Sequence, residues 1–162
     1  MKGREVADDQ ELVDTYRQHR HELVRFATVL VGPDAAHDVV SSAVLRVLER
    51  DSSGIDKPKA YLYQAVANQA RNHSRSEERR RNREEKAAHS IVVPAASEPF
   101  PEVREAIERL SVRQRAVIYL YYWEDLPERA VAEHLRITTG SVRRHLYRAR
   151  RHLRKALHDD DR

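Results

Sequence analysis

The C-terminal segment from Asp125 to Leu157, DLPERAVAEHLRITTGSVRRHLYRARRHLRKAL, constrains the fold more than any other part of the chain. Its apolar residues recur at helical spacing on both sides of a short break, so the segment predicts two helices joined by a tight turn. The second helix carries apolar side chains on one side and arginines on the other. A helix-turn-helix has this layout, because one helix packs while the next lies in the DNA major groove.

The ends of these two helices carry residues that favour helix termini. Asp125 is expected to cap the first helix, with Pro127 in its first turn and Glu128 at capping-box spacing. Thr138 or Thr139 is expected to cap the second helix. Between the helices, Ile137 is expected to fill the core beneath the turn.

The second helix is expected to separate into an apolar seam and a basic face. The seam contains Val142, Leu146, Ala149, Leu153 and Leu157. The opposite side carries Arg144, Arg148, Arg151 and Lys155. Most basic runs are only solvated surfaces, but here no acidic residue interrupts the run from Ser141 to Leu157, and it follows a capped turn. This pattern favours contact with DNA phosphates and guanine edges.

Length and composition predict a helical protein with local basic patches. The chain has 162 residues, which allows one medium-sized domain or two small ones. It has four glycines and only 6% aromatic residues, and no strongly alternating apolar run occurs, so we expect an all-α fold. The net charge is only +4, but positive charge is concentrated at residues 71–86 and 143–155. Such a distribution suits nucleic-acid binding.

Several function classes find no support in the sequence. Cysteine is absent, which excludes disulfides and thiolate metal sites and makes a reducing cytoplasm the expected location. No apolar signal segment or membrane-length run occurs, so membrane insertion is not expected. His19 and His21 lie two apart, a spacing that points them away from each other on a helix. With no metalloprotease motif or Gly-rich phosphate loop, we expect no enzyme, catalytic residue, metal, cofactor or small-molecule substrate.

The N-terminal half predicts three helices, over about residues 9–31, 34–50 and 56–74. Asp34 is expected to cap the second helix. The third is expected to fray beyond Ser74, where the composition becomes highly charged.

A proline-containing segment divides the chain. Residues 89–101 hold three prolines and no helical period, so they are expected to form a flexible linker. Beyond it, Ser111 and Gln114 give a capping box ahead of the densest apolar cluster in the chain. The predicted organisation is two small helical domains, residues 1–88 and 102–162, joined by the linker 89–101.

The order of these pieces resembles a bacterial RNA polymerase sigma factor of the sigma-70 family, of the extracytoplasmic-function type. The strongest resemblance is to sigma region 4, over RLSVRQRAVIYLYYWEDLPERAVAEHLRITTGSVRRHLYRARRHL. KPKAYLYQAVANQARN resembles regions 2.3 and 2.4, and GPDAAHDVVSSAVLRVL resembles region 2.2. Two motif blocks in the right order are more specific than a lone helix-turn-helix.

This resemblance implies a factor that binds core RNA polymerase and directs promoter-specific transcription initiation. The implied contacts with the minus-35 duplex are Thr139, Ser141, Arg143, Arg144 and Arg148. The implied contacts with the melted minus-10 element are Tyr61, Asn68, Gln69, Arg71, Asn72 and Arg75. The implied contacts with core polymerase are Asp38, Val39, Ser41, Ser42 and Leu45. The resemblance also implies an anti-sigma factor as a partner.

The minus-10 set mixes amides, an aromatic ring and cations, as the capture of unstacked bases requires. Asn68 favours a functional role, because asparagine contributes little to a helix interior by propensity. Tyr63, in contrast, is expected to be a core residue.

The chain departs from the family pattern at several positions. Arg136 stands in the helix-turn-helix turn where the family often has glycine, so either the turn differs or a strained left-handed residue is tolerated. Ser41 and Ser42 replace a common glutamine and acid, and Tyr61 replaces a common tryptophan. We expect these changes to affect polymerase affinity and melting strength more than the fold.

Two alternatives remain open at this point. A stand-alone helix-turn-helix regulator would bind DNA without polymerase, usually as a dimer on two half-sites. A sigma-like decoy would bind polymerase or a regulator without opening a promoter.

Overall fold

The computed structural model describes residues 2–49, 55–84 and 101–158, and these residues form helices without any strand. The elements are α1 (Lys2–Val31), α2 (Pro33–Leu48), α3 (Pro58–Glu84), α4 (Pro101–Glu108), α5 (Val112–Ile118), the π-helix η1 (Tyr119–Trp123), α6 (Glu128–Leu135) and α7 (Thr139–His158). The all-α prediction is therefore confirmed. The predicted linker lies almost entirely outside the described residues, and the domain boundaries stay a prediction.

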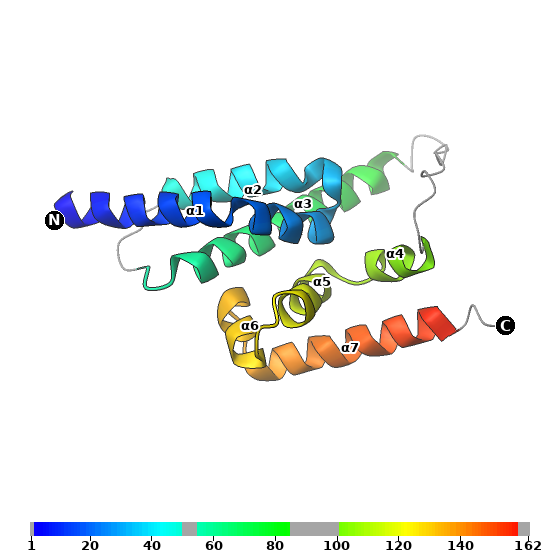
Figure 1. Ribbon diagram of the computed structural model, residues 1–162. Coiled ribbons are helices and arrows are strands. Elements are labelled where there is room, and N and C mark those ends of the chain that lie inside the picture. Colours follow the sequence, from blue (N-terminus) through cyan, green and yellow to red (C-terminus); the bar gives the residue numbers. More distant parts are fainter. Residues whose placement is uncertain (1, 50–54, 85–100, 159–162) are drawn as a thin grey trace.

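The first unit consists of α1, α2 and α3, which pack against one another along their length (Figure 1). Each helix turns an apolar stripe inward. Leu23 and Leu30 of α1, Val40 of α2 and Leu62 and Val66 of α3 are all buried. Burying an aliphatic side chain of this size contributes about 1.5–3 kcal/mol, so these stripes are sufficient to hold three helices together.

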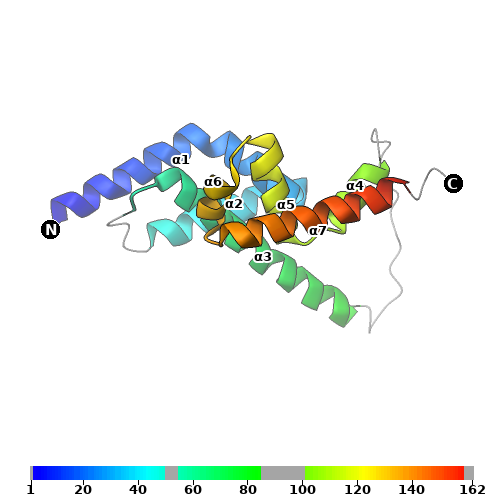
Figure 2. The ribbon, with the colours of Figure 1, turned by 90° about the horizontal axis from the view of Figure 1, so that it is seen from below.

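The second unit consists of α4, α5, η1, α6 and α7. Helix α7 is the central helix of this unit, because α4, α5 and α6 all pack against it (Figure 2). The predicted seam is confirmed at Val142, Leu146 and Ala149, which are buried, whereas Leu153 is only partly buried. The predicted capping box is also confirmed: Ser111 Oγ accepts from the Gln114 amide, and Gln114 Oε1 accepts from the Ser111 amide.

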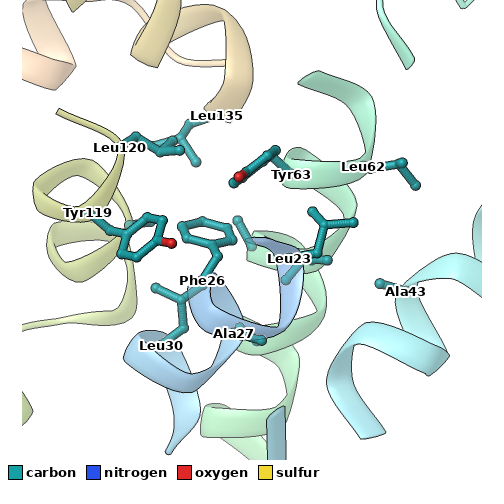
Figure 3. Packing of buried hydrophobic residues seen from close by; sticks show 14 of the residues in the cluster. Leu23, Phe26, Ala27, Leu30, Ala43, Leu62, Tyr63, Tyr119, Leu120 and Leu135 are labelled. Atoms are coloured by element: carbon teal, nitrogen blue, oxygen red, sulfur yellow. The ribbon is translucent and has the colours of Figure 1, made fainter. Parts of the chain in front are cut away.

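The two units share one continuous core. Helices α5 and α6 lie against α1 and α3, with the ring of Phe26 between two tyrosines, one from each unit (Figure 3). The ring centroids of Phe26 and Tyr63 are 5.0 Å apart, and those of Phe26 and Tyr119 are 5.2 Å apart. Leu120 and Leu135 complete the cluster from the second unit. Aromatic pairs at this spacing stabilise by about 0.5–1.5 kcal/mol beyond their buried area.

Polar contacts frame this shared core. Lys57, just before α3, forms an ion pair with Glu133 of α6. Within the first unit, Glu22 Oε2 lies 2.9 Å from Lys59 Nζ and 3.1 Å from His19 Nδ1, and it accepts a long 3.5 Å hydrogen bond from Tyr63 Oη. Burial raises the pKa of Glu22, but the hydrogen bonds from Lys59 and His19 outweigh it, so the pKa is lowered overall. The charged Glu22 thus fixes α1 to the start of α3.

Two expectations about the ends of α2 and α3 were wrong. Asp34 does not cap α2, because the helix begins at Pro33 and Gly32 occupies the cap position. Gly32 has a φ of 88°, which residues with a side chain rarely adopt. Helix α3 does not fray at Ser74 but continues to Glu84. Its charged extension is supported by same-helix pairs such as Glu77–Arg80, with a 2.8 Å separation.

Candidate nucleic-acid interface

The helix-turn-helix consists of α6, a short turn and α7. Its N-terminal cap differs from the prediction, because Asp125 has φ 50° and lies outside the helix, and Pro127 occupies the cap position without a side-chain hydrogen bond. Aspartate tolerates this left-handed conformation better than most residues. The turn itself contains Arg136 at φ 47° and ψ 53°, so the turn keeps its left-handed geometry and the arginine bears the strain.

The start of α7 is capped as predicted. Thr138 Oγ1 accepts from the Ser141 amide at 3.1 Å, which selects Thr138 over Thr139 as the capping residue. Ile137 is partly buried and packs against the core, as expected. The first turn of α7 carries no acidic residue, so the positive end of the helix dipole is not neutralised locally. This end of α7 is therefore suited to anionic phosphates.

The five predicted minus-35 residues fall into two groups. Arg144 and Arg148 lie on the face of α7 opposite the seam; both are exposed, and neither has an ion-pair partner within the described residues. Arg143 is exposed but donates from Nε to Glu128 at 2.6 Å. Thr139 and Ser141 are half-buried in the first turn. Of the five predicted residues, Arg144 and Arg148 are thus the cations most available to a ligand.

A neighbouring flank of α7 carries residues that the sequence analysis did not select. Arg150 donates from Nε to Tyr122 Oη at 2.7 Å, and its guanidinium lies 5.5 Å from the Tyr122 ring centroid. This hydrogen bond to Tyr122 raises the pKa of Arg150. Tyr147 is 66% exposed on the same flank, and Trp123 is 72% exposed nearby in sequence. Arg150 lies four residues after the seam residue Leu146, so the sequence places it on the same side of the helix as the seam. The sequence gave no indication that Tyr122 is its partner.

The predicted minus-10 residues lie along one helix, α3. Asn68, Asn72 and Arg75 are exposed at spacings of four and three, which places them on one helical face. Tyr61, Gln69 and Arg71 are half-buried, and Gln69 Oε1 is buried with no hydrogen-bond partner among the described residues. Tyr63, in contrast, is 1% exposed, which confirms it as a core residue.

The predicted polymerase-facing residues lie on α2. Asp38, Ser41 and Leu45 are exposed, with Leu45 exposing 60% of its surface, and Ser42 is half-buried. Val39 does not belong to this face, because it is buried against the core. The exposed part of the predicted set is therefore Asp38, Ser41 and Leu45.

Across residues 2–49, 55–84 and 101–158, no three histidine, aspartate or glutamate side chains are grouped so that they could hold a metal ion. None of the described helices is long and apolar enough to span a bilayer.

Comparisons with known proteins agree with this geometry. The family model described as "Sigma-70 region 2" matches residues 15–80, and the one described as "Sigma-70, region 4" matches residues 101–153. A similar solved structure is the co-crystal structure of the sigma factor RpoE in complex with the anti-sigma factor NepR from Bartonella quintana. It is 25% identical, with a TM-score of 0.60, and the match covers 91% of this chain and 94% of that chain. No curated protein sequence matches the chain.

Two successive sigma modules, each on its own helical unit, define a class of transcription initiation factor. The chain belongs to the sigma-70 family and is a sigma factor of the extracytoplasmic-function type.

Proposed function

We propose that this chain binds core RNA polymerase and directs it to promoters by reading a minus-35 duplex and a melted minus-10 element. The observation that carries the proposal is the presence of two separate polar faces on two sigma modules. One is the exposed arginine face of α7, and the other is the Asn68, Asn72 and Arg75 face of α3.

The minus-35 element is read by α7 in the major groove. Arg144 and Arg148 are four residues apart, so both project from the same side of the helix. Arginine donates two parallel hydrogen bonds to guanine O6 and N7, which supports base reading by these residues. Thr139 and Ser141, at the positive end of the helix, are placed to contact the flanking phosphates.

The minus-10 element is captured by α3 as a single strand. The amides of Asn68 and Asn72 provide donors and acceptors for base edges, and Arg75 provides a cation for the backbone. Gln69 and Arg71 lie beside them, and Tyr61 contributes a half-buried ring at the start of the helix. The buried and unpaired Gln69 Oε1 supports a ligand-dependent role for that side chain, since a buried polar atom is ordinarily satisfied.

Promoter binding requires the two units to separate. By their names the two elements are about 25 base pairs apart, which is about 85 Å at about 3.4 Å per step. In the free chain, Arg71 of α3 and His145 of α7 both lie near Arg113 of α5, so the two faces are neighbours. The packed arrangement is therefore a resting form, and we infer that polymerase and promoter binding pull α5 and α6 away from α1 and α3.

The proposed partners follow from the exposed surfaces. Core polymerase binds the Asp38, Ser41 and Leu45 face of α2, with Ser42 at its edge. An anti-sigma factor is a further partner, supported by the similarity to RpoE, which was crystallised in complex with the anti-sigma factor NepR. The proposal places residues 1–88 and 102–162 as the two functional domains, with 89–101 as the connection, acting in the cytoplasm.

Run-off transcription with purified core polymerase and genomic fragments tests this function. We expect discrete start sites that share an upstream motif and depend on this chain, and we expect them to disappear with Arg144→Ala plus Arg148→Ala. An intact DNA footprint with no transcripts would instead support a stand-alone regulator. Polymerase binding with no transcripts would support a decoy.

A further inference from the structure

A groove with five arginines among its twelve lining residues lies between α3 of the first unit and α5 of the second. It has a volume of about 620 Å³. Five arginines and two glutamates line it: Arg71, Arg75, Arg81, Arg113, Arg115, Glu78 and Glu108. Because its walls come from both units, the groove exists only while the units are packed together.

The cations of this groove have few counter-charges. Among the residues that the structure describes, Arg71, Arg75 and Arg113 take part in no ion pair. Of the two groove acids, Glu108 is engaged by Arg104, with 3.1 Å between Arg104 Nε and Glu108 Oε1. Burial lowers the pKa of Arg115 and Glu108 raises it, so Glu108 offsets part of the groove charge. With five arginines against two glutamates, the groove still presents net positive charge from two units to a single space.

A bound anion would stabilise two arginine side chains in the groove, Arg113 and Arg115. The pKa of Arg113 is lowered, first by burial and then by the positive charge of Arg71, so packing brings two like charges together. Arg115 Nε is buried and has no hydrogen-bond partner among the described residues. A bound anion would attract both Arg71 and Arg113, and it could accept a charge-assisted hydrogen bond from the groove.

We propose that the groove between α3 and α5 binds a phosphate-bearing ligand, which bridges Arg71 and Arg113 and holds the two units in the packed arrangement. Phosphate oxygens suit this site because the guanidinium fork pairs with them in a bidentate way. The ligand is either a free polyphosphate or the backbone of a nucleic acid, since both present the same oxygens. Neither the binding nor the closure requires polymerase. Arg71 and Arg75 also belong to the proposed minus-10 set, so the test changes Arg113, which does not.

Binding is tested on the full chain without polymerase, by calorimetry with inorganic pyrophosphate, ATP and a short oligothymidylate. We expect Arg113→Gln to weaken binding about tenfold or more, as loss of a charge-assisted hydrogen bond predicts. The matched control is Arg20→Gln, an exposed arginine of α1, which should bind like the unmodified chain. Arg113-dependent binding of pyrophosphate and ATP would identify a free phosphate ligand, whereas Arg113-dependent binding of the oligonucleotide alone would identify a nucleic-acid backbone.

Closure is measured on the same protein by energy transfer between two dyes. The chain has no cysteine, so Gln18→Cys on α1 and Lys155→Cys on α7 can be labelled without removing native thiols. We expect the bound probe to increase energy transfer, and Arg113→Gln to abolish the increase. No binding by any of the three probes, or equal losses in Arg113→Gln and Arg20→Gln, would overturn the proposal. Neither result would bear on run-off transcription, which tests the proposed function separately.

Discussion

The rings of Tyr63 and His134 meet edge to face with their centroids 5.6 Å apart, and this contact joins α3 to the first helix of the helix-turn-helix. His134 donates from Nδ1 to the Ala130 carbonyl at 2.8 Å, which fixes the ring within α6. Tyr63 is held in place by its ring contact with Phe26 and its hydrogen bond to Glu22. The helix proposed to hold the minus-10 strand is therefore tied to the module proposed to hold the minus-35 duplex.

Removing this ring contact should loosen the packed arrangement. We expect His134→Ala to lose about 0.5–1.5 kcal/mol of interface stability, the range for an aromatic pair of this geometry. Energy transfer between the labels at positions 18 and 155 should fall. His37→Ala, at an exposed position of α2, is the matched control and should leave the signal unchanged. Identical signals from both variants would mean that the Tyr63–His134 contact does not hold the two units together.

Acidification should also open the packed form through His134. Burial lowers the pKa of His134 below its ordinary value near 6.5; Lys59 lowers it further, whereas Glu133, Glu124 and the Ala130 carbonyl raise it. The packed form thus keeps the ring neutral, and an open form binds the proton more readily. The contribution of His134 is full above its ordinary pKa and is lost as the pH falls through the lowered pKa.

A pH titration of the energy transfer measures this effect. Between about pH 7.5 and about 5.5, where most carboxylates stay charged, we expect the packed fraction to decrease. His134→Gln should flatten this dependence. A titration with the same slope in both proteins would assign the effect to other groups.

Arg144 and Arg148 should account for much of the minus-35 affinity. Each change to alanine should weaken binding to a promoter duplex by about 1–3 kcal/mol if the side chain reads a base. Fluorescence anisotropy on matched and scrambled duplexes separates base reading from phosphate contact, because only base reading depends on sequence. Arg17→Ala, which removes a paired arginine of α1, is the control. Unchanged affinity in both α7 variants would exclude these arginines from the interface.

Asn68 should matter for promoter melting and little for duplex binding. We expect Asn68→Ala to reduce the open-complex signal of a fluorescent base in the minus-10 element, because the amide contact with an unpaired base is lost. Asn82→Ala, an exposed asparagine near the far end of the same helix, is the control. Normal opening with Asn68→Ala would discard base capture by this residue.

Arg136 should carry a stability cost that glycine removes. We expect Arg136→Gly to stabilise the chain by about 1 kcal/mol, since a side chain in the left-handed region costs about 1–2 kcal/mol. Arg129→Gly, inside α6, should instead destabilise by about 1 kcal/mol. Thermal unfolding of both variants measures the difference. A lower melting temperature for Arg136→Gly would mean that its side chain stabilises the turn in another way.

Local patterns in the sequence predicted the helices and several caps, because these features depend on neighbouring residues. The Ser111 capping box, Thr138 and the α7 seam follow from spacing alone. The predicted cap at Asp125 was wrong. Aspartate favours cap positions by residue type, but the backbone at Asp125 is left-handed. The resemblance placed Val39 on a partner surface, but Val39 is buried, and its spacing to Ala43 matches the buried stripe of α2.

The relation between the two units could not be predicted from spacing. Tyr63 was expected to be a core residue, whereas Phe26 and Tyr119 were not singled out. Nothing local in the sequence indicates that these three rings meet. The same applies to Arg71 and Arg113, which come from different units. Helical periodicity assigns a buried face but does not name its partner.

The distance between the two units during promoter binding tests the account most directly. The chain labelled at positions 18 and 155 is measured free and in a transcribing complex with core polymerase and promoter DNA. We predict high energy transfer in the free chain and a large decrease in the complex, because one chain must span two separated elements. Active transcription with unchanged high transfer would contradict the account.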